Sequence, residues 1–160
     1  MRRCLLRDLA TFEAELAAFP DDATVWRTHP GIPNVTGTLV LHAAGNLRHF
    51  IGAVLGHDGY RRDRDAEFAR RDVPRSELVE ELRAASRAVD AALAGLDPAR
   101  LDETYPLEVA GVRLPTGRFL VHLATHLAYH LGQADIHRRV VTGDPAGVGA
   151  VSPPGPEVRG

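Results

Sequence analysis

Residues 119–139, FLVHLATHLAYHLGQADIHRR, form one long apolar stretch in which histidines recur on a single side. At about 100° per residue, one helical band collects His122, His126, Tyr129, His130, Gln133 and His137. Leu, Val, Ala and Ile make up most of the remaining surface, and Asp135 is the only formal charge before His137. This pattern predicts a helix buried on all sides, with its imidazoles directed at something inside the protein.

Three further helices are predicted from apolar residues that recur at three- and four-residue steps. They cover about residues 4–19, 36–56 and 76–96, and Pro20 ends the first of them. Asn34 or Thr36 is the expected N-cap of the second helix, and Thr116 that of the last. The helix at 36–56 is apolar on two faces, which favours two packing partners, one of them a second copy of the chain.

The connections between these helices define the predicted topology. Residues 57–75 are rich in charge of both signs, which is typical of a solvated segment. Nineteen residues span up to roughly 60 Å, enough to return along a 20-residue helix of about 30 Å. Residues 101–114 alternate with period two around Ala110-Gly111 and predict a short β-hairpin. We therefore expect an all-α four-helix bundle with a long overhand connection between helices two and three and this hairpin before helix four.

Composition narrows the functional classes. The 160 residues suit a single domain, predicted at 1–142, followed by a flexible Pro/Gly-rich tail at 143–160. The net charge of −2 gives no reason to expect nucleic acid or a membrane surface as partner. Cys4 is the single cysteine, so there is no intramolecular disulfide, which fits a reducing compartment. Charges within the first ten residues argue against a signal peptide, so a cytoplasmic location is expected.

The histidine band predicts a metal site. His126 and His130 are four residues apart, so their side chains are neighbours on the helix and both reach one metal ion. A third ligand is available on the helix at 36–56, where His42 and His49 lie about 10 Å apart along the axis. Only one of these two can join the site, and their spacing leaves the choice open. The alternative is that all these histidines make ordinary hydrogen bonds.

Three neutral imidazoles would leave one coordination position open, which is typical of catalytic rather than structural sites. Nitrogen donors favour Zn, Ni, Fe or Co over Mg or Ca. Such a metal would lower the pKa of a coordinated water or polarise a substrate oxygen or sulfur. Gln133 is one turn beyond His130 and could orient a ligand. Further candidates for the surroundings of the site are His49, Asn46, Tyr129 and His122.

Two passages carry a resemblance to a known family. HLAYHLGQADIHRR resembles the HxxxHxxQ signature of the DinB/YfiT-like superfamily, matched by His126, His130 and Gln133. LVLHAAGNLRHFIGAVLG resembles the helix-two segment of the same family, whose ligand falls on His42 and leaves His49 as an extra histidine. The resemblance implies the overhand four-helix bundle, a three-His site for a divalent ion such as Zn or Ni, and homodimers.

The resemblance also indicates the chemistry. Some members of the family are thiol-dependent S-transferases that use low-molecular-weight thiols such as bacillithiol, mycothiol or glutathione, and others are treated as hydrolases. The expected function is therefore metal-dependent transfer or hydrolysis on a small molecule, with His42, His126 and His130 as ligands and no identified general base. The alternative is a non-catalytic, metal-binding or stress-related dimer.

Overall fold

The protein is all-α, as predicted. A computed structural model describes residues 1–149, and within them the regular structure is helical. The long elements are α1 (Arg2–Ala17), α3 (Thr36–Leu47) with its continuation η1 (Arg48–Ala53), α5 (Arg75–Ala94) and α6 (Thr116–Thr142). Short helices occupy the connections: α2 (Asp22–Val25), α4 (Arg64–Ala69) and the 3₁₀ helix η2 (Pro98–Leu101).

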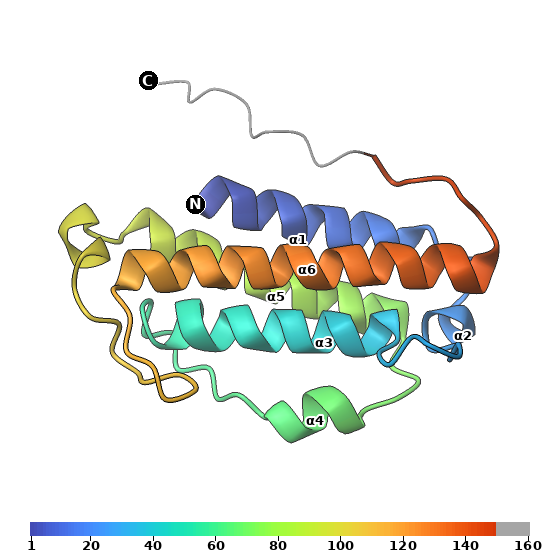
Figure 1. Ribbon diagram of the computed structural model, residues 1–160, viewed down its shortest axis with the longest axis horizontal. Coiled ribbons are helices and arrows are strands. Elements are labelled where there is room, and N and C mark those ends of the chain that lie inside the picture. Colours follow the sequence, from blue (N-terminus) through green and yellow to red (C-terminus); the bar gives the residue numbers. More distant parts are fainter. Residues whose placement is uncertain (150–160) are drawn as a thin grey trace.

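The four long helices lie side by side and enclose one apolar core (Figure 1). Each of α1 and α3 packs against both α5 and α6. The predicted stripes form this core: Leu5, Leu9, Phe12 and Leu16 from α1; Leu78, Leu82, Ala85 and Val89 from α5; Leu120, Leu123, Leu127, Leu131 and Ala134 from α6. Burying each leucine side chain stabilises the fold by on the order of 1.5–3 kcal/mol. The residues that recur with the helical period are therefore the ones that stabilise the core.

The connection between α3 and α5 contains a helix that the sequence interpretation missed. Both long helices run in the same direction, and residues 54–74 return along them (Figure 1). α4 forms within this return because the Asp63 side chain accepts a hydrogen bond from the Ala66 backbone N–H and caps its start. The interpretation of the whole segment as solvated was wrong, because Glu67 of α4 is only 6% exposed.

The predicted helix at 36–56 changes its hydrogen-bonding pattern partway. From Arg48 to Ala53 it is π-helical, which widens the turn by one residue and frees backbone carbonyls. One of these, the carbonyl of Phe50, accepts a 2.6 Å hydrogen bond from the Tyr105 hydroxyl. Tyr105, which is 55 positions away in the sequence, therefore contacts this π-helical segment.

The predicted N-caps, Asn34 or Thr36 for α3 and Thr116 for α6, were wrong. Val35 and Pro115 occupy the cap positions of α3 and α6, and neither contributes a side-chain hydrogen bond. The Thr36 hydroxyl lies 2.8 Å from Nδ1 of His137, and the Thr116 hydroxyl donates to the carbonyl of Glu103. Each hydroxyl is thus used in a tertiary contact, which competes with local capping.

Residues 101–115 fold back on themselves before α6. The Tyr105 backbone N–H donates to the Leu114 carbonyl, and Val109 pairs with Val112 around a turn. Ala110 and Gly111 have φ values of 51° and 76°, the pair of positive angles that a tight two-residue turn requires. These contacts are isolated bridges, and none of the residues that the structure describes forms an extended strand.

Trp26 lies in the connection between α1 and α3 and packs into the core. It is 7% exposed, and its indole N–H donates to the Val73 carbonyl at 3.0 Å.

After α6, the first part of the predicted tail contacts that helix, because Arg138 donates to the Ala146 carbonyl. Residues 150–160, the rest of that predicted flexible tail, lie outside the described residues.

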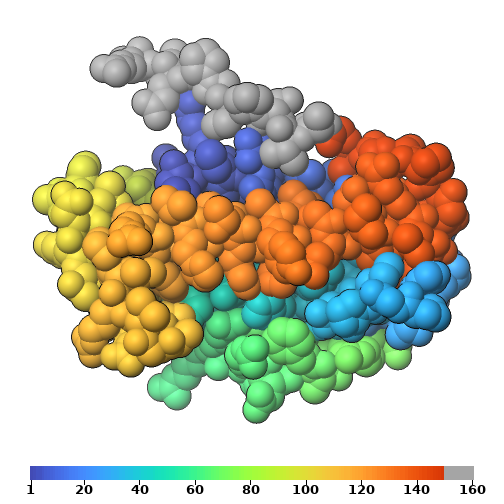
Figure 2. Space-filling view, viewed as in Figure 1, coloured from blue at the N-terminus to red at the C-terminus, as the bar shows by residue number. Residues whose placement is uncertain are grey.

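The expectation that α6 is buried all round was wrong. Figure 2 shows α6 as a continuous orange-to-red band across one face of the molecule. Four large side chains on this band are between 43% and 64% exposed: Val121, Tyr129, Ile136 and Val140. The helix is apolar on its outer side as well, but only its inner side is covered within one chain.

Among the helices of residues 1–149, none combines the length and apolarity needed to cross a membrane.

Candidate metal centre

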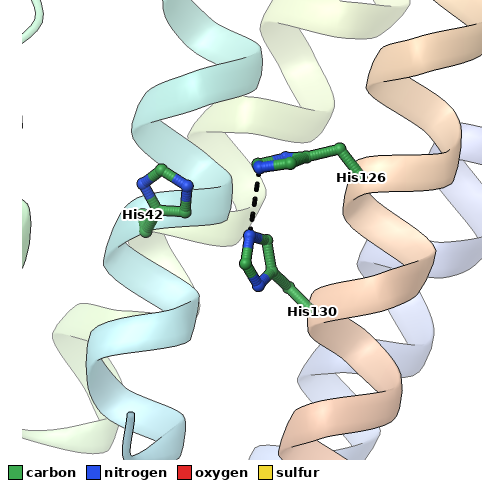
Figure 3. A group of neighbouring side chains, drawn as sticks. All are labelled: His42, His126 and His130. Atoms are coloured by element: carbon green, nitrogen blue, oxygen red, sulfur yellow. Dashed lines mark hydrogen bonds between the residues drawn. The ribbon is translucent and has the colours of Figure 1, made fainter. Parts of the chain in front are cut away.

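Three imidazoles meet between α3 and α6 (Figure 3). His126 and His130 project from successive turns of α6, and His42 approaches them from α3. One ring nitrogen from each lies within 4.8 Å of the other two, and the Nε2 atoms of His126 and His130 are 3.1 Å apart. The rings of the α6 pair stand edge-on to that of His42, with centroids at 5.3 and 5.0 Å.

The local sequence explains why these side chains point inward. On α6, the buried leucines 123, 127 and 131 each follow a histidine of the band by one position, so they anchor the helix with its histidine side against α3. On α3, His42 is followed by Ala43, Ala44 and Gly45, whose small side chains allow the helix to be buried at every position. His42 is 8% exposed, whereas the α6 pair is half-buried. The cluster therefore has one accessible side.

Hydrogen bonds to the outer ring nitrogens orient two of the three imidazoles. Nδ1 of His130 lies 2.8 Å from Oε1 of Gln133, and Nδ1 of His42 lies 3.0 Å from Oε2 of Glu67. Each oxygen is an acceptor, so these two contacts favour a hydrogen on Nδ1 and a lone pair on Nε2. This is the tautomer in which a histidine offers Nε2 to a metal ion.

Sequence reasoning did not identify Glu67 or its partner Arg62. Arg62 binds the Glu67 carboxylate through Nε at 2.6 Å and through its NH2 group at 2.7 Å. The signal that could have revealed Glu67 was local: Asp63 is a capping residue, and Asp65 and Glu67 place acidic side chains in the first turn that follows it. A short helix was thus predictable at 64–69, although its burial was not.

The α6 pair is held in its neutral form. Burial, together with the neighbouring His130 and His42, lowers the pKa of His126 from 6.5 to about 4. Burial also lowers the pKa of His130, although its hydrogen bond to Gln133 acts in the opposite direction. For Glu67, burial alone would raise the pKa, but hydrogen bonds from Arg62 and His42 outweigh it and hold the pKa below its ordinary value. At neutral pH the site therefore combines a neutral α6 pair with an ionised Glu67 carboxylate beside His42.

This arrangement fits a transition-metal ion. Two imidazole nitrogens at about 2.0–2.1 Å from a tetrahedral zinc are separated by roughly 3.3–3.4 Å, close to the 3.1 Å between His126 and His130. Neutral nitrogen donors suit Zn, Ni, Fe or Co. One turn beyond His42, the buried Oδ1 of Asn46 has no hydrogen-bond partner in the part of the chain that the structure describes. A polar atom of this kind is usually satisfied by a water or a ligand.

The other predicted candidates occupy different positions around the cluster. His49 lies on η1, where its ring contacts Phe50, and it is not among the three histidines that converge. Tyr129 is 64% exposed, with its ring 5.5 Å from that of His130. His122 stacks on Phe119 and lies one turn before His126, at 5.9 Å between rings.

His137 shares the histidine band but not the site. Its Nε2 lies 2.8 Å from the Arg27 carbonyl, and its Nδ1 accepts from the Thr36 backbone N–H. Nδ1 therefore joins α6 to the start of α3, and Nε2 joins α6 to the segment that follows α2. This histidine is fully buried and holds these three parts of the chain together.

The fold and the cluster define an all-α protein with three histidines from two facing helices, a donor set compatible with metal binding. The chain belongs to the DinB superfamily, whose sequence profile matches residues 5–134 and so includes all three histidines. No curated protein and no solved structure matches the chain.

The metal-free protein should lose stability in acid partly through this cluster. The folded-state pKa of His126 is about 4 against 6.5 for an ordinary histidine, so the unfolded chain binds the extra proton first. Its contribution is therefore fully present above about pH 6.5 and lost as the pH falls toward 4. Urea denaturation between pH 7 and pH 4.5 should show a shallower decline for His126→Gln than for the wild type. Equal declines would mean that His126 is not held neutral by its surroundings.

Proposed function

We propose that the protein is a metal-dependent enzyme that acts on a small molecule, with His42, His126 and His130 holding a divalent transition metal, Zn or Ni in the first instance. One observation carries the proposal: three ring nitrogens from two helices converge within 4.8 Å, with one side of the cluster accessible. A metal held there would supply Lewis acidity to a substrate oxygen or sulfur. The three histidines would bind it, and Gln133 would keep His130 oriented.

A small apolar cavity one turn of α6 away from the cluster supports an enzymatic role. It has a volume of about 210 Å³, and Tyr105, Leu107, Val109, Leu114, Phe119 and His122 contribute to its wall. His122 connects this cavity to the cluster, because it lies against both Phe119 and His126. We infer that the apolar part of the substrate occupies the cavity while its reactive group reaches the histidines.

For the reaction itself, we propose transfer of a low-molecular-weight thiol, or hydrolysis, in line with the family resemblance. A cytoplasmic location belongs to the same proposal, because a reducing compartment keeps such a thiol in the reactive form. We also infer that the ring of long helices is the overhand four-helix bundle of the family and that residues 101–114 are its β-hairpin.

The test begins with protein purified without a histidine tag. Elemental analysis should find about one transition metal per chain after loading with Zn²⁺ or Ni²⁺. The loaded protein should then consume a thiol in the presence of an electrophilic acceptor, or hydrolyse an activated ester or amide. Metal binding without either reaction would favour the non-catalytic alternative, and absence of metal binding would refute both.

The second apolar face of the helix at 36–56, expected to meet another copy of the chain, is covered within one chain, because every residue of α3 is buried. We further propose that the protein is a homodimer that uses the outer face of α6 instead. Exposed apolar residues follow this face, and the small Ala128 and Gly132 between them permit close approach of a second helix. A hollow of about 450 Å³ borders the same face, between α6 and residues 31–34. A two-fold axis would place this face against its own copy and cover both.

Ile136→Glu is expected to convert the dimer to a monomer, because it places a charge on an apolar contact surface. Light scattering should give about twice the chain mass for the wild type and the chain mass for the variant. Val112→Glu is the matched control, since Val112 is 50% exposed on the loop before α6 and Ile136 is 56% exposed. A wild-type mass equal to that of one chain would refute the proposal.

A further inference from the structure

The carboxylate of Glu67 reaches the candidate metal centre from the connection between α3 and α5. It comes from α4, 25 residues after His42, and α4 packs on the side of α3 opposite to α6 (Figure 1). Its Oε2 atom is 3.0 Å from Nδ1 of His42, and the residue is 6% exposed. The carboxylate therefore contacts Nδ1 of His42 and leaves Nε2 available to a metal ion.

Arg62 determines how this carboxylate is oriented. Its Nε and NH2 groups bind the two carboxylate oxygens of Glu67 separately, at 2.6 and 2.7 Å, in the fork geometry that fixes both groups in one plane. The Arg62 side chain is 12% exposed. Arg62 thus fixes both oxygens of the Glu67 carboxylate in position.

Two tautomers of His42 are compatible with the neighbours of Nδ1, and the contact distances distinguish between them. If Nδ1 carries the hydrogen, it donates to Oε2 of Glu67 at 3.0 Å; if it carries the lone pair, it accepts from Arg62 at 3.3 Å. In the second state a lone pair would face an ionised carboxylate oxygen across 3.0 Å, which is repulsive. The first state has the shorter contact and an attractive one.

The backbone of α3 makes room for this arrangement. A Cβ atom placed on Gly45 would lie 2.2 Å from Oε1 of Glu67, closer than any real contact. Gly45 has no need of glycine for its backbone angles, because it lies inside a regular α-helix. The missing side chain at position 45 is therefore explained by the space that the carboxylate occupies.

Stability alone is a poor explanation for this buried ion pair. Removing two charges from water is expensive, and replacing a buried pair with apolar residues is often neutral or stabilising. In contrast, a carboxylate that accepts a hydrogen bond from the outer N–H of a metal-binding histidine orients the ring. It also makes the other ring nitrogen more basic, and therefore a stronger ligand for the metal.

We propose that Glu67, held by Arg62, is the positioning residue of the metal centre: it keeps His42 in the Nδ1–H tautomer, so that the lone pair of Nε2 faces His126 and His130. The inference rests on the proposed metal-binding function, since it assigns Glu67 a role toward one of the three ligands. It also assigns a role to α4, which delivers the carboxylate to the site from the connecting segment.

The test compares zinc dissociation constants, measured by competition with a chromogenic chelator. Glu67→Ala should weaken binding by about 10–100-fold, the usual effect of removing such a partner, and Glu67→Gln should recover part of the loss because its amide oxygen can still accept from Nδ1. Glu15→Ala is the matched control. Glu15 is 2% exposed and pairs with Arg138 at 2.6 Å, so the control removes an equally buried carboxylate without touching the cluster.

A second variant leaves every charge in place. Gly45→Ala should displace the Glu67 carboxylate and weaken zinc binding in the same direction as Glu67→Ala. Gly95→Ala is its control, because the nearest atom to a Cβ there is 3.9 Å away. Near-wild-type affinity in both Glu67→Ala and Gly45→Ala would overturn the inference.

The tautomer of His42 is measurable without metal. In ¹⁵N-labelled, metal-free protein, long-range ¹H–¹⁵N correlations should show His42 protonated at Nδ1 and unprotonated at Nε2, and Glu67→Ala should shift this balance. A wild-type His42 protonated at Nε2 would overturn the positioning role. Failure of the wild type to bind zinc would instead refute the proposed function, so the two failures are distinguishable.

Discussion

His130→Ala is expected to weaken zinc binding by more than 100-fold. His130 supplies one of the three converging nitrogens and also orients itself through Gln133, so its removal costs more than the 10–100-fold attributed to an outer partner. Metal at about 1,000 times its dissociation constant stabilises a folded protein by roughly 4 kcal/mol. The variant should lose most of this stabilisation at the same metal concentration.

Thermal unfolding with and without zinc measures this effect, and isothermal titration provides the affinity. His122→Ala is the control, because His122 lies on the same band of α6 but is exposed and outside the cluster. Its zinc-dependent increase in melting temperature should equal that of the wild type. If His122→Ala lost the increase while His130→Ala kept it, the ligand assignment would be wrong. Loss of the increase in His49→Ala but not in His42→Ala would reverse the choice on α3.

Arg138→Met is expected to lower the free energy of unfolding by about 3–5 kcal/mol, the typical effect of removing one partner of a buried ion pair. Arg138 is 1% exposed and donates to Glu15 at 2.6 Å and to the Ala146 carbonyl at 2.6 Å. Methionine fills a similar volume but leaves the Glu15 carboxylate buried without its cation. A decrease of this size would be a large fraction of the stability of a typical domain.

Urea denaturation at neutral pH measures this decrease, and the neighbouring arginine is a close control. Arg139 pairs with Asp135 at 2.9 Å, but its side chain is 37% exposed. Arg139→Met should therefore change the free energy of unfolding by less than about 1 kcal/mol. The double variant Glu15→Leu/Arg138→Met should recover much of the loss, because it removes both charges. A loss in the double variant as large as in Arg138→Met would show that the unpaired carboxylate is not the cause.

These two buried carboxylates show why much of the site lay beyond sequence reasoning. Glu15 and Glu67 look like ordinary acidic residues of an amphipathic helix and of a charged connection. Each is buried together with an arginine that binds it. Glu15 is bound by Arg138, 123 residues away, and Glu67 is bound by Arg62, five residues before it in the connection between α3 and α5. Residue type gives no indication of such pairing, since charged side chains are mostly solvated.

The sequence by itself determined the four long helices and half of the candidate site. The apolar period of each long helix specifies which face is buried, and the four-residue spacing of His126 and His130 places both rings on one side of α6 whatever lies opposite. These features depend on the geometry of a single helix, so they are local.

The tertiary structure decided the rest: that His42, the position indicated by the family resemblance, does face the α6 pair while His49 does not, that α4 brings Glu67 beside it, that His137 joins α6 to α3, and that one side of α6 is uncovered. Each of these depends on the rotation and approach of elements distant in sequence. The helical period fixes which residues share a face, whereas packing among all the helices decides what that face meets.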